Sequence, residues 1–157
     1  MTCVDVGVAV VLVALSVGAP AAQSPADVSG VWRLDERVGA GLASVIPVVE
    51  TITADAFEVT IIRATQPPST ERYPLDDGER TVTRVRGQIR VCRARWEAPQ
   101  LVIACVQPDR GPGGLAPPIL TREVRFLDPD GRLVVESTWR SGTRQTTQRS
   151  TYVRQPQ

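Results

Sequence analysis

The chain has 157 residues and a formal net charge of +1, and it contains no lysine, no histidine and no asparagine, so that all 18 basic residues are arginine. Without histidine, Ser–His and Cys–His catalytic couples and imidazole metal ligands are excluded, and without lysine so are Schiff bases and phosphate-loop lysines. A charge this close to zero gives no argument for a polyanionic partner.

The N-terminal segment is typical of an export signal. Residues 6–17 form an apolar run, too short to span a bilayer, which takes about 20 residues, and Ala19-Pro20-Ala21 follows as an Ala-x-Ala cleavage site. No positive charge precedes the run and Asp5 is acidic, so an uncleaved anchor is the alternative. We predict a periplasmic or secreted protein without a membrane span after cleavage, with a signal peptide over 1–21, a linker over 22–28 and one domain over 29–157.

The remainder of the chain consists of short strand-like segments separated by turns. These segments are rich in Val, Ile and Thr, and no window shows sustained helical periodicity. Residues 71–75 are expected at a sheet edge, because Pro74 cannot donate a backbone hydrogen bond. Turn residues at 128–131 and at 141–142 mark two hairpins. The expected strands are 29–35, 48–53, 57–64, 71–75, 81–85, the two arms of a central hairpin at 89–106, 119–127, 132–140 and 143–154, with irregular segments at 38–46 and 109–118.

Eight to ten antiparallel strands with frequent turns predict an all-β fold, a barrel or a sandwich. Hairpins that follow one another in sequence favour an up-and-down meander. A meander of that many strands removes its exposed edges by closing into a barrel, which is the architecture that we expect.

The central hairpin predicts a disulfide bond. Folding it about Ala98 and Pro99 places Cys92 directly opposite Cys105, with Cα atoms roughly 4.5–5.5 Å apart, which is within reach of a disulfide. Once a signal containing Cys3 is removed, these two cysteines are an even number in an exported chain, the setting in which a disulfide persists. Because side chains alternate along a strand, the same apolar face also carries Ala94, Trp96, Leu101 and Ile103.

Several short motifs occur in a defined order along the chain. They are Ser-Gly-x-Trp-x-Leu-Asp from Ser29, Thr-Ile-Thr from Thr51, Tyr-Pro-Leu-Asp from Tyr73, Ala-Arg-Trp-Glu from Ala94 ahead of Leu-Val-Ile, Leu-Asp-Pro-Asp-Gly-Arg-Leu-Val-Val-Glu from Leu127, and a final Tyr-Val-Arg from Tyr152. This order resembles the small, exported, lipocalin-like β-barrel proteins of bacteria. The resemblance covers essentially the whole mature chain.

The triplet Gly30-Val31-Trp32 also resembles the Gly-x-Trp of lipocalins, in which the tryptophan closes one barrel end under an arginine from a late strand. The resemblance implies that Gly30 and Trp32 lie at a barrel end with Arg154, while Arg144 and Arg149 are weaker matches. Two departures concern the ligand more than the fold. The chain has no Thr-Asp-Tyr-like second lipocalin motif, and its predicted disulfide staples a hairpin instead of tying the barrel wall to the terminus.

Two functions from different classes are compatible with these features. The leading hypothesis is an exported, non-enzymatic binding protein that holds a small apolar or amphipathic molecule in its barrel, although the same side chains could fill a solid core. The alternative is a protein-interaction or inhibitor module of the cell envelope, which would bind an envelope protein. The cavity candidates are Ala94, Ile103, Leu133 and Val135 along the wall, with Trp96 and Trp139 deeper. The alternative would use loop 109–118 and an arginine-rich strand face containing Arg80, Arg84, Arg86, Arg90, Arg93 and Arg95.

No pattern in the chain supports catalysis, a metal or a cofactor. No serine lies in a Gly-x-Ser-x-Gly elbow, and both cysteines are committed to the predicted disulfide. Pairing Glu123 with Glu136 as acid and base would require a cleft between them, and the acidic turns lack the twelve-residue spacing of a calcium loop. Nucleic acid is disfavoured because no aromatic residues interleave the arginines. We therefore expect a monomeric, non-enzymatic protein.

Overall fold

The computed structural model describes residues 27–39, 48–83, 89–108 and 117–156. The predicted signal peptide (1–21) lies outside these ranges, as do most of the linker (22–28) and of the irregular segments at 38–46 and 109–118. The described residues form ten strands: β1 (Gly30–Gly39), β2 (Val49–Ala54), β3 (Glu58–Arg63), β4 (Ser69–Pro74), β5 (Arg80–Thr83), β6 (Ile89–Glu97), β7 (Gln100–Gln107), β8 (Ile119–Leu127), β9 (Leu133–Ser141) and β10 (Arg144–Arg154).

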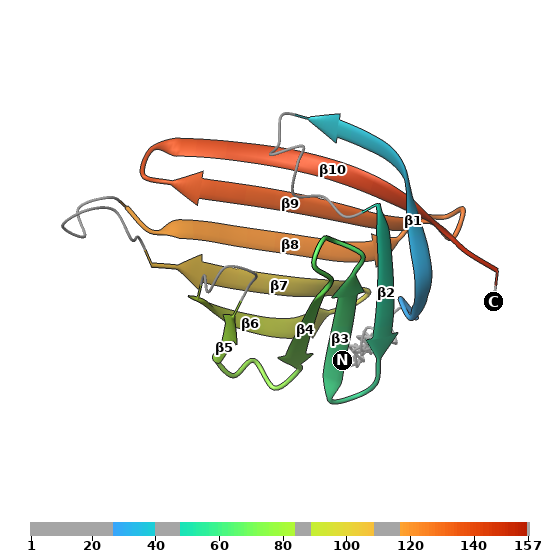
Figure 1. Cartoon of the computed structure of the whole chain (residues 1–157), viewed down its shortest axis with the longest axis horizontal. Coiled ribbons are helices and arrows are strands. Elements are labelled where there is room, and N and C mark those ends of the chain that lie inside the picture. Colours follow the sequence, from blue (N-terminus) through green and yellow to red (C-terminus); the bar gives the residue numbers. More distant parts are fainter. Residues whose placement is uncertain (1–26, 40–47, 84–88, 109–116, 157) are drawn as a thin grey trace, which may run out of the picture.

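The ten strands make one antiparallel sheet in the order β4-β3-β2-β1-β10-β9-β8-β7-β6-β5. Except for β4 and β5, strands that follow one another in the chain are neighbours, and the first strand also pairs with the last. In Figure 1, β1 to β4 curve across one end of the layer formed by β6 to β10. The prediction of an all-β, up-and-down meander that curls into a barrel is confirmed.

The barrel closes differently from our expectation. Its two sheet edges, β4 and β5, face each other, but among the described residues they are not paired by backbone hydrogen bonds. Prolines at both ends of β4 cannot donate such bonds, and β5 has only four residues, so neither strand offers a long ladder. The edge position predicted for residues 71–75 is thus confirmed, whereas the prediction that closure removes every edge is wrong.

Strand β1 is longer than the sequence predicted. It continues past residue 35 to Gly39, with an irregularity in the register between Leu34 and Glu36. The extra residues pair with Gln148, Arg149 and Ser150 because β10, with eleven residues, extends far enough to meet them. The expectation that residues 38 and 39 are irregular is therefore wrong.

The hairpin of β6 and β7 has the predicted register. Cys92 pairs with Cys105, Ala94 pairs with Ile103, and the two Cys Cα atoms are 4.1 Å apart and joined through a disulfide bond. Both cysteines are buried inside the barrel. The predicted disulfide is confirmed.

The hydrophobic core lies on the inner face of the sheet. It draws side chains from strands at both ends of the chain, so that burial of apolar area ties the meander together. The most deeply buried members include Trp32, Ile52, Val59, Tyr73, Leu101, Leu133 and Tyr152.

Candidate functional site in the barrel interior

The six residues proposed to line a cavity all lie on the inner face. Ala94, Ile103, Leu133 and Val135 belong to the buried core, and Trp96 packs against it. Trp139 shares the face of Leu133 and Val135 by strand alternation. The two tryptophans are partly exposed whereas the other four residues are buried, so the prediction that the tryptophans lie deeper is wrong. Both tryptophans lie near the ends of their strands, where fewer neighbours cover them.

A charged cluster shares this inner face and was not predicted. Its members point into the interior, where five are buried and Glu123 is half-buried, because each lies two positions from an inward-facing neighbour on its own strand. The sequence analysis grouped Arg90 with the arginine-rich strand face, but the structure buries its side chain in the interior. The signal was available, since Arg90 has the same parity as the inward-facing Cys92 and Ala94. The cluster consists of Glu50 on β2, Arg63 on β3, Glu71 on β4, Arg90 on β6, and Glu123 and Arg125 on β8.

Two arginines from opposite walls of the barrel share their acidic partners. Arg125 Nη1 donates to Glu50 Oε2 at 2.6 Å, and Arg125 Nη2 donates to Glu123 Oε2 at 2.8 Å. Arg63 Nε donates to Glu50 Oε1 at 3.0 Å, and its Nη2 lies 3.4 Å from Glu123 Oε2. Arg63 also pairs with Glu71. The network therefore links β2, β3 and β4 to β8 through the barrel interior.

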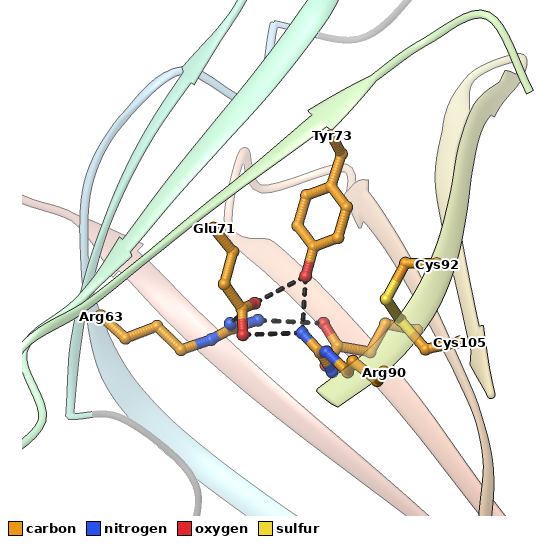
Figure 2. The surroundings of a disulfide bond; sticks show 7 residues. Arg63, Glu71, Tyr73, Arg90, Cys92 and Cys105 are labelled. Atoms are coloured by element: carbon orange, nitrogen blue, oxygen red, sulfur yellow. Dashed lines mark hydrogen bonds and ion pairs between the residues drawn. A yellow bond between two sulfur atoms is a disulfide. The ribbon is translucent and has the colours of Figure 1, made fainter. Parts of the chain in front are cut away.

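The same network also crosses the gap between the unpaired edge strands, because it connects β4 to β6. Arg90 Nη2, on β6, lies 2.7 Å from Glu71 Oε1 and donates to the Tyr73 hydroxyl at 2.7 Å. That hydroxyl donates in turn to Glu71 Oε2 at 2.6 Å. Figure 2 shows these side chains converging beside the disulfide bond. Side-chain interactions thus join the edge strand β4 to β6, the neighbour of the other edge strand β5, where backbone pairing is missing.

Neighbouring charges keep Glu123 and Arg125 ionised in the barrel interior. Burial by itself would raise the pKa of Glu123, but the charges of Arg125, Arg63 and Arg90 hold that pKa well below its usual range. Burial would lower the pKa of Arg125, and the neighbouring Glu50 and Glu123 raise it instead. Burial also raises the pKa of Tyr73, which keeps its hydroxyl protonated and able to donate. Glu123 and Arg125 are therefore both ionised inside the barrel.

A few buried polar atoms at this site have no hydrogen-bond partner among the described residues. They are Nε of Arg90, Nε of Arg125, and both amide atoms of Gln148. Gln148 is only 1% exposed, and it lies on β10 between inward-facing neighbours. In the strand register Gln148 pairs with Ser137, which pairs with Glu123. Gln148 is therefore two strands from the charged cluster, roughly 10 Å across the sheet.

Exposure of the inner face changes along β8, β9 and β10. The cross-strand row of Arg125, Val135 and Ser150 is buried. The row of Thr121, Trp139 and Thr146 is half-buried, and Ile119 beyond it is 37% exposed. Solvent therefore reaches the inner face from the β9–β10 turn, at the end of these strands away from the β1–β4 crossing in Figure 1.

The opposite end is sealed by the Gly30-Val31-Trp32 segment. Trp32 is fully buried, and its Nε1 donates to the Val28 carbonyl at 2.9 Å. Arg154 lies over the indole ring of Trp32, and its Cζ is 4.7 Å from the ring centroid. Its Nη2 donates to the Asp27 carbonyl at 3.0 Å. Gly30 has a φ of 141°, a conformation that side-chain-bearing residues rarely adopt. Of the three arginines considered, Arg154 is the one stacked on Trp32, whereas Arg149 lies over Phe126.

The exposed arginines of the proposed interaction face are paired with acids. Arg80 pairs with Asp76 at 3.0 Å, Arg93 with Glu79 at 2.6 Å, and Arg95 lies 3.3 Å from Asp77 and also pairs with Glu97. The fold brings the acids of the 76–79 turn against strand β6, so this face is less basic than its sequence suggests. Residues 84 and 86 lie outside the described ranges, as does most of loop 109–118.

The other chemical possibilities find no support in the described residues. Glu123 faces the interior, whereas Glu136 faces outward and lies 3.3 Å from Arg149, so the two acids are on opposite faces of the sheet. No group of three or more potential metal ligands occurs among the residues that the structure describes. Within the same ranges no helix has the length and apolar character needed to cross a membrane.

Comparison with solved structures identifies the fold. The chain is similar to zebrafish ileal bile acid-binding protein in complex with cholic acid (14% identity, TM-score 0.58, covering 81% of this chain and 98% of that one). It is also similar to Caenorhabditis elegans lipid binding protein 8 (13% identity, TM-score 0.60, covering 81% of this chain and 94% of that one). A third similar structure is human cRBP IV (15% identity, TM-score 0.54, covering 83% of this chain and 100% of that one). No protein-family model and no curated protein matches the sequence. The chain therefore has the fold of these small β-barrel proteins.

Proposed function

We propose that this protein is an exported, non-enzymatic binding protein that holds one small amphipathic molecule inside its barrel. The observation that carries the proposal is the uneven closure of the interior. Trp32 and Arg154 seal one end, whereas solvent reaches the inner face of β8–β10 at the other end, around the half-buried Trp139. An interior that is open at one end and sealed at the other suits a ligand site better than a solid core.

The inner face offers both kinds of contact that an amphipathic molecule needs. Trp139 near the open end and the buried Ile103 and Val135 supply apolar area. Gln148 and the guanidinium groups of the cluster supply unsatisfied polar atoms at greater depth. Leaving a buried donor or acceptor unpaired costs about 1–3 kcal/mol, so a ligand that pairs with these atoms recovers part of that free energy. We therefore expect the polar end of the molecule to face inward.

The similar solved structures support the proposal, because they are binding or transport proteins. The similar solved structures are those of a bile acid-binding protein, a lipid binding protein and a fatty acid transporter. A binding role without catalysis is in line with the absence of histidine and lysine from the chain. Export is supported by the N-terminal segment and by the disulfide, which persists in oxidising compartments.

Native mass spectrometry of the protein purified from its own host tests the proposal. We expect a monomer carrying one co-purifying small molecule, and we expect Trp139→Ala to lose that molecule. Phe57→Ala is the matched control, because Phe57 is 81% exposed on the outside of the barrel. The proposal fails if the wild-type protein carries nothing and takes up no molecule from a lipid extract. Salt-sensitive capture of one envelope protein by that bare protein would favour the interaction-module hypothesis instead.

A further inference from the structure

Charge balance inside the barrel restricts what the ligand's polar end can be. Glu50, Glu71 and Glu123 face the three interior arginines, and each described arginine has at least one carboxylate within ion-pair distance. The described cluster contains three acidic and three basic side chains, so their formal charges cancel. An added buried charge, negative or positive, has no free counter-charge among these residues, and an unpaired buried charge is strongly disfavoured.

The groups that do lack partners are those that an uncharged polar group can satisfy. Nε of Arg90 and Nε of Arg125 are donors, while the Gln148 amide has one acceptor and one donor group. Ser137 lies directly opposite Gln148 in the register, and Ser150 is the next inward-facing residue of β10. This surface can therefore receive a hydroxyl or an amide, which both donates and accepts hydrogen bonds.

We infer that the barrel selects a molecule whose polar end is an uncharged hydroxyl or amide group, in preference to a carboxylate or an ammonium group. This inference rests on the proposed function and narrows it. A carboxylate could also accept the free hydrogen bonds, but its charge would face arginines that are already neutralised by glutamates. An alcohol or an amide makes the same hydrogen bonds without adding a charge to the interior.

A matched panel of probes tests the inference at neutral pH: dodecanol, dodecanamide, dodecanoate and dodecylammonium. All four have the same chain, and their affinities for the full-length protein are measured by displacement of Nile red, an uncharged dye. We expect the alcohol or the amide to bind at least about tenfold more tightly than either ion, where tenfold corresponds to about 1.4 kcal/mol. Preference for dodecanoate overturns the inference but leaves the proposed function standing. Binding of none of the four, nor of any component of a lipid extract, overturns both.

Glu123→Gln separates charge selection from the different water solubilities of the probes. The side chain of Glu123 is 17% exposed, more than that of any other cluster acid, so this substitution perturbs the cluster least. It leaves one arginine charge uncompensated, and we expect dodecanoate to gain at least about tenfold relative to dodecanol. An unchanged ratio in the folded variant refutes the inference, because the solubility of each probe is the same for both proteins.

Gln148→Leu provides a second variant in case Glu123→Gln does not fold. We expect it to lose about tenfold in affinity for dodecanamide, which pairs with both amide atoms. Gln145→Leu is the matched control, because Gln145 is exposed and lies on the outer face of the same strand. Equal affinities of the two leucine variants for dodecanamide would contradict the role given to Gln148.

Discussion

Glu50 bridges two buried arginines, so replacing it by glutamine measures how strongly the fold depends on the interior charge cluster. Glu50→Gln keeps the shape of the side chain but removes the charge that faces both Arg63 and Arg125. Removing one partner of a buried ion pair destabilises proteins by about 3–5 kcal/mol. Because a domain of this kind has a free energy of unfolding of about 5–15 kcal/mol, that loss is a large fraction of the total. The melting temperature should fall by roughly 6–20 °C.

Urea and thermal denaturation, followed by tryptophan fluorescence and circular dichroism, measure this loss. Glu136→Gln is the matched control, because Glu136 pairs with Arg149 at 3.3 Å on the outside, where the two side chains are 43% and 53% exposed. A surface pair of this kind contributes at most about 1 kcal/mol. Equal free energies of unfolding for the two variants would refute the reasoning. Such a result would mean that the free energy of unfolding does not depend on the charge of Glu50.

Four further predictions follow from the same structure. Trp32→Ala should lower the free energy of unfolding by about 3–5 kcal/mol, as other buried aromatic truncations do; a urea midpoint equal to that of the wild type would be inconsistent with a sealed barrel end. The double replacement of Cys92 and Cys105 by Ala should lower it by about 2–3 kcal/mol and retain the fold, and thiol titration of the oxidised wild-type barrel should detect neither cysteine. Because Glu123 has a lowered pKa in the folded state, its contribution to stability should be present above pH 4.5 and decline as the pH falls below that value; acid denaturation curves of Glu123→Gln should lack that part of the decline. Both tyrosines of the chain have pKa values raised by burial above the usual 10.0, so the folded protein should lose stability as the pH rises beyond 10.0, and tyrosinate absorbance should appear only at higher pH or on unfolding.

The sequence alone determined the features that depend on local pattern. Alternating apolar residues and turn residues predicted the antiparallel meander. The position of the Ala98-Pro99 turn set the register that places Cys92 opposite Cys105. These features can be predicted because a two-residue period and a short hairpin loop constrain each strand without reference to distant parts of the chain.

Two features depended on residues far apart in the sequence. The seam between β4 and β5 depends on how far the whole sheet curls before its edges meet, which no hairpin specifies by itself. The interior charges are the other feature, since the parity of Arg90 with Cys92 and Ala94 indicates its face but not which acids pair with it there. Arg125 is paired in the interior both by Glu123 on its own strand and by Glu50, which lies 75 positions away in the sequence and reaches it from β2. An isolated buried charge is prohibitively costly and a paired one is tolerated, so whether an arginine faces inward is decided by partners that only the tertiary structure brings together.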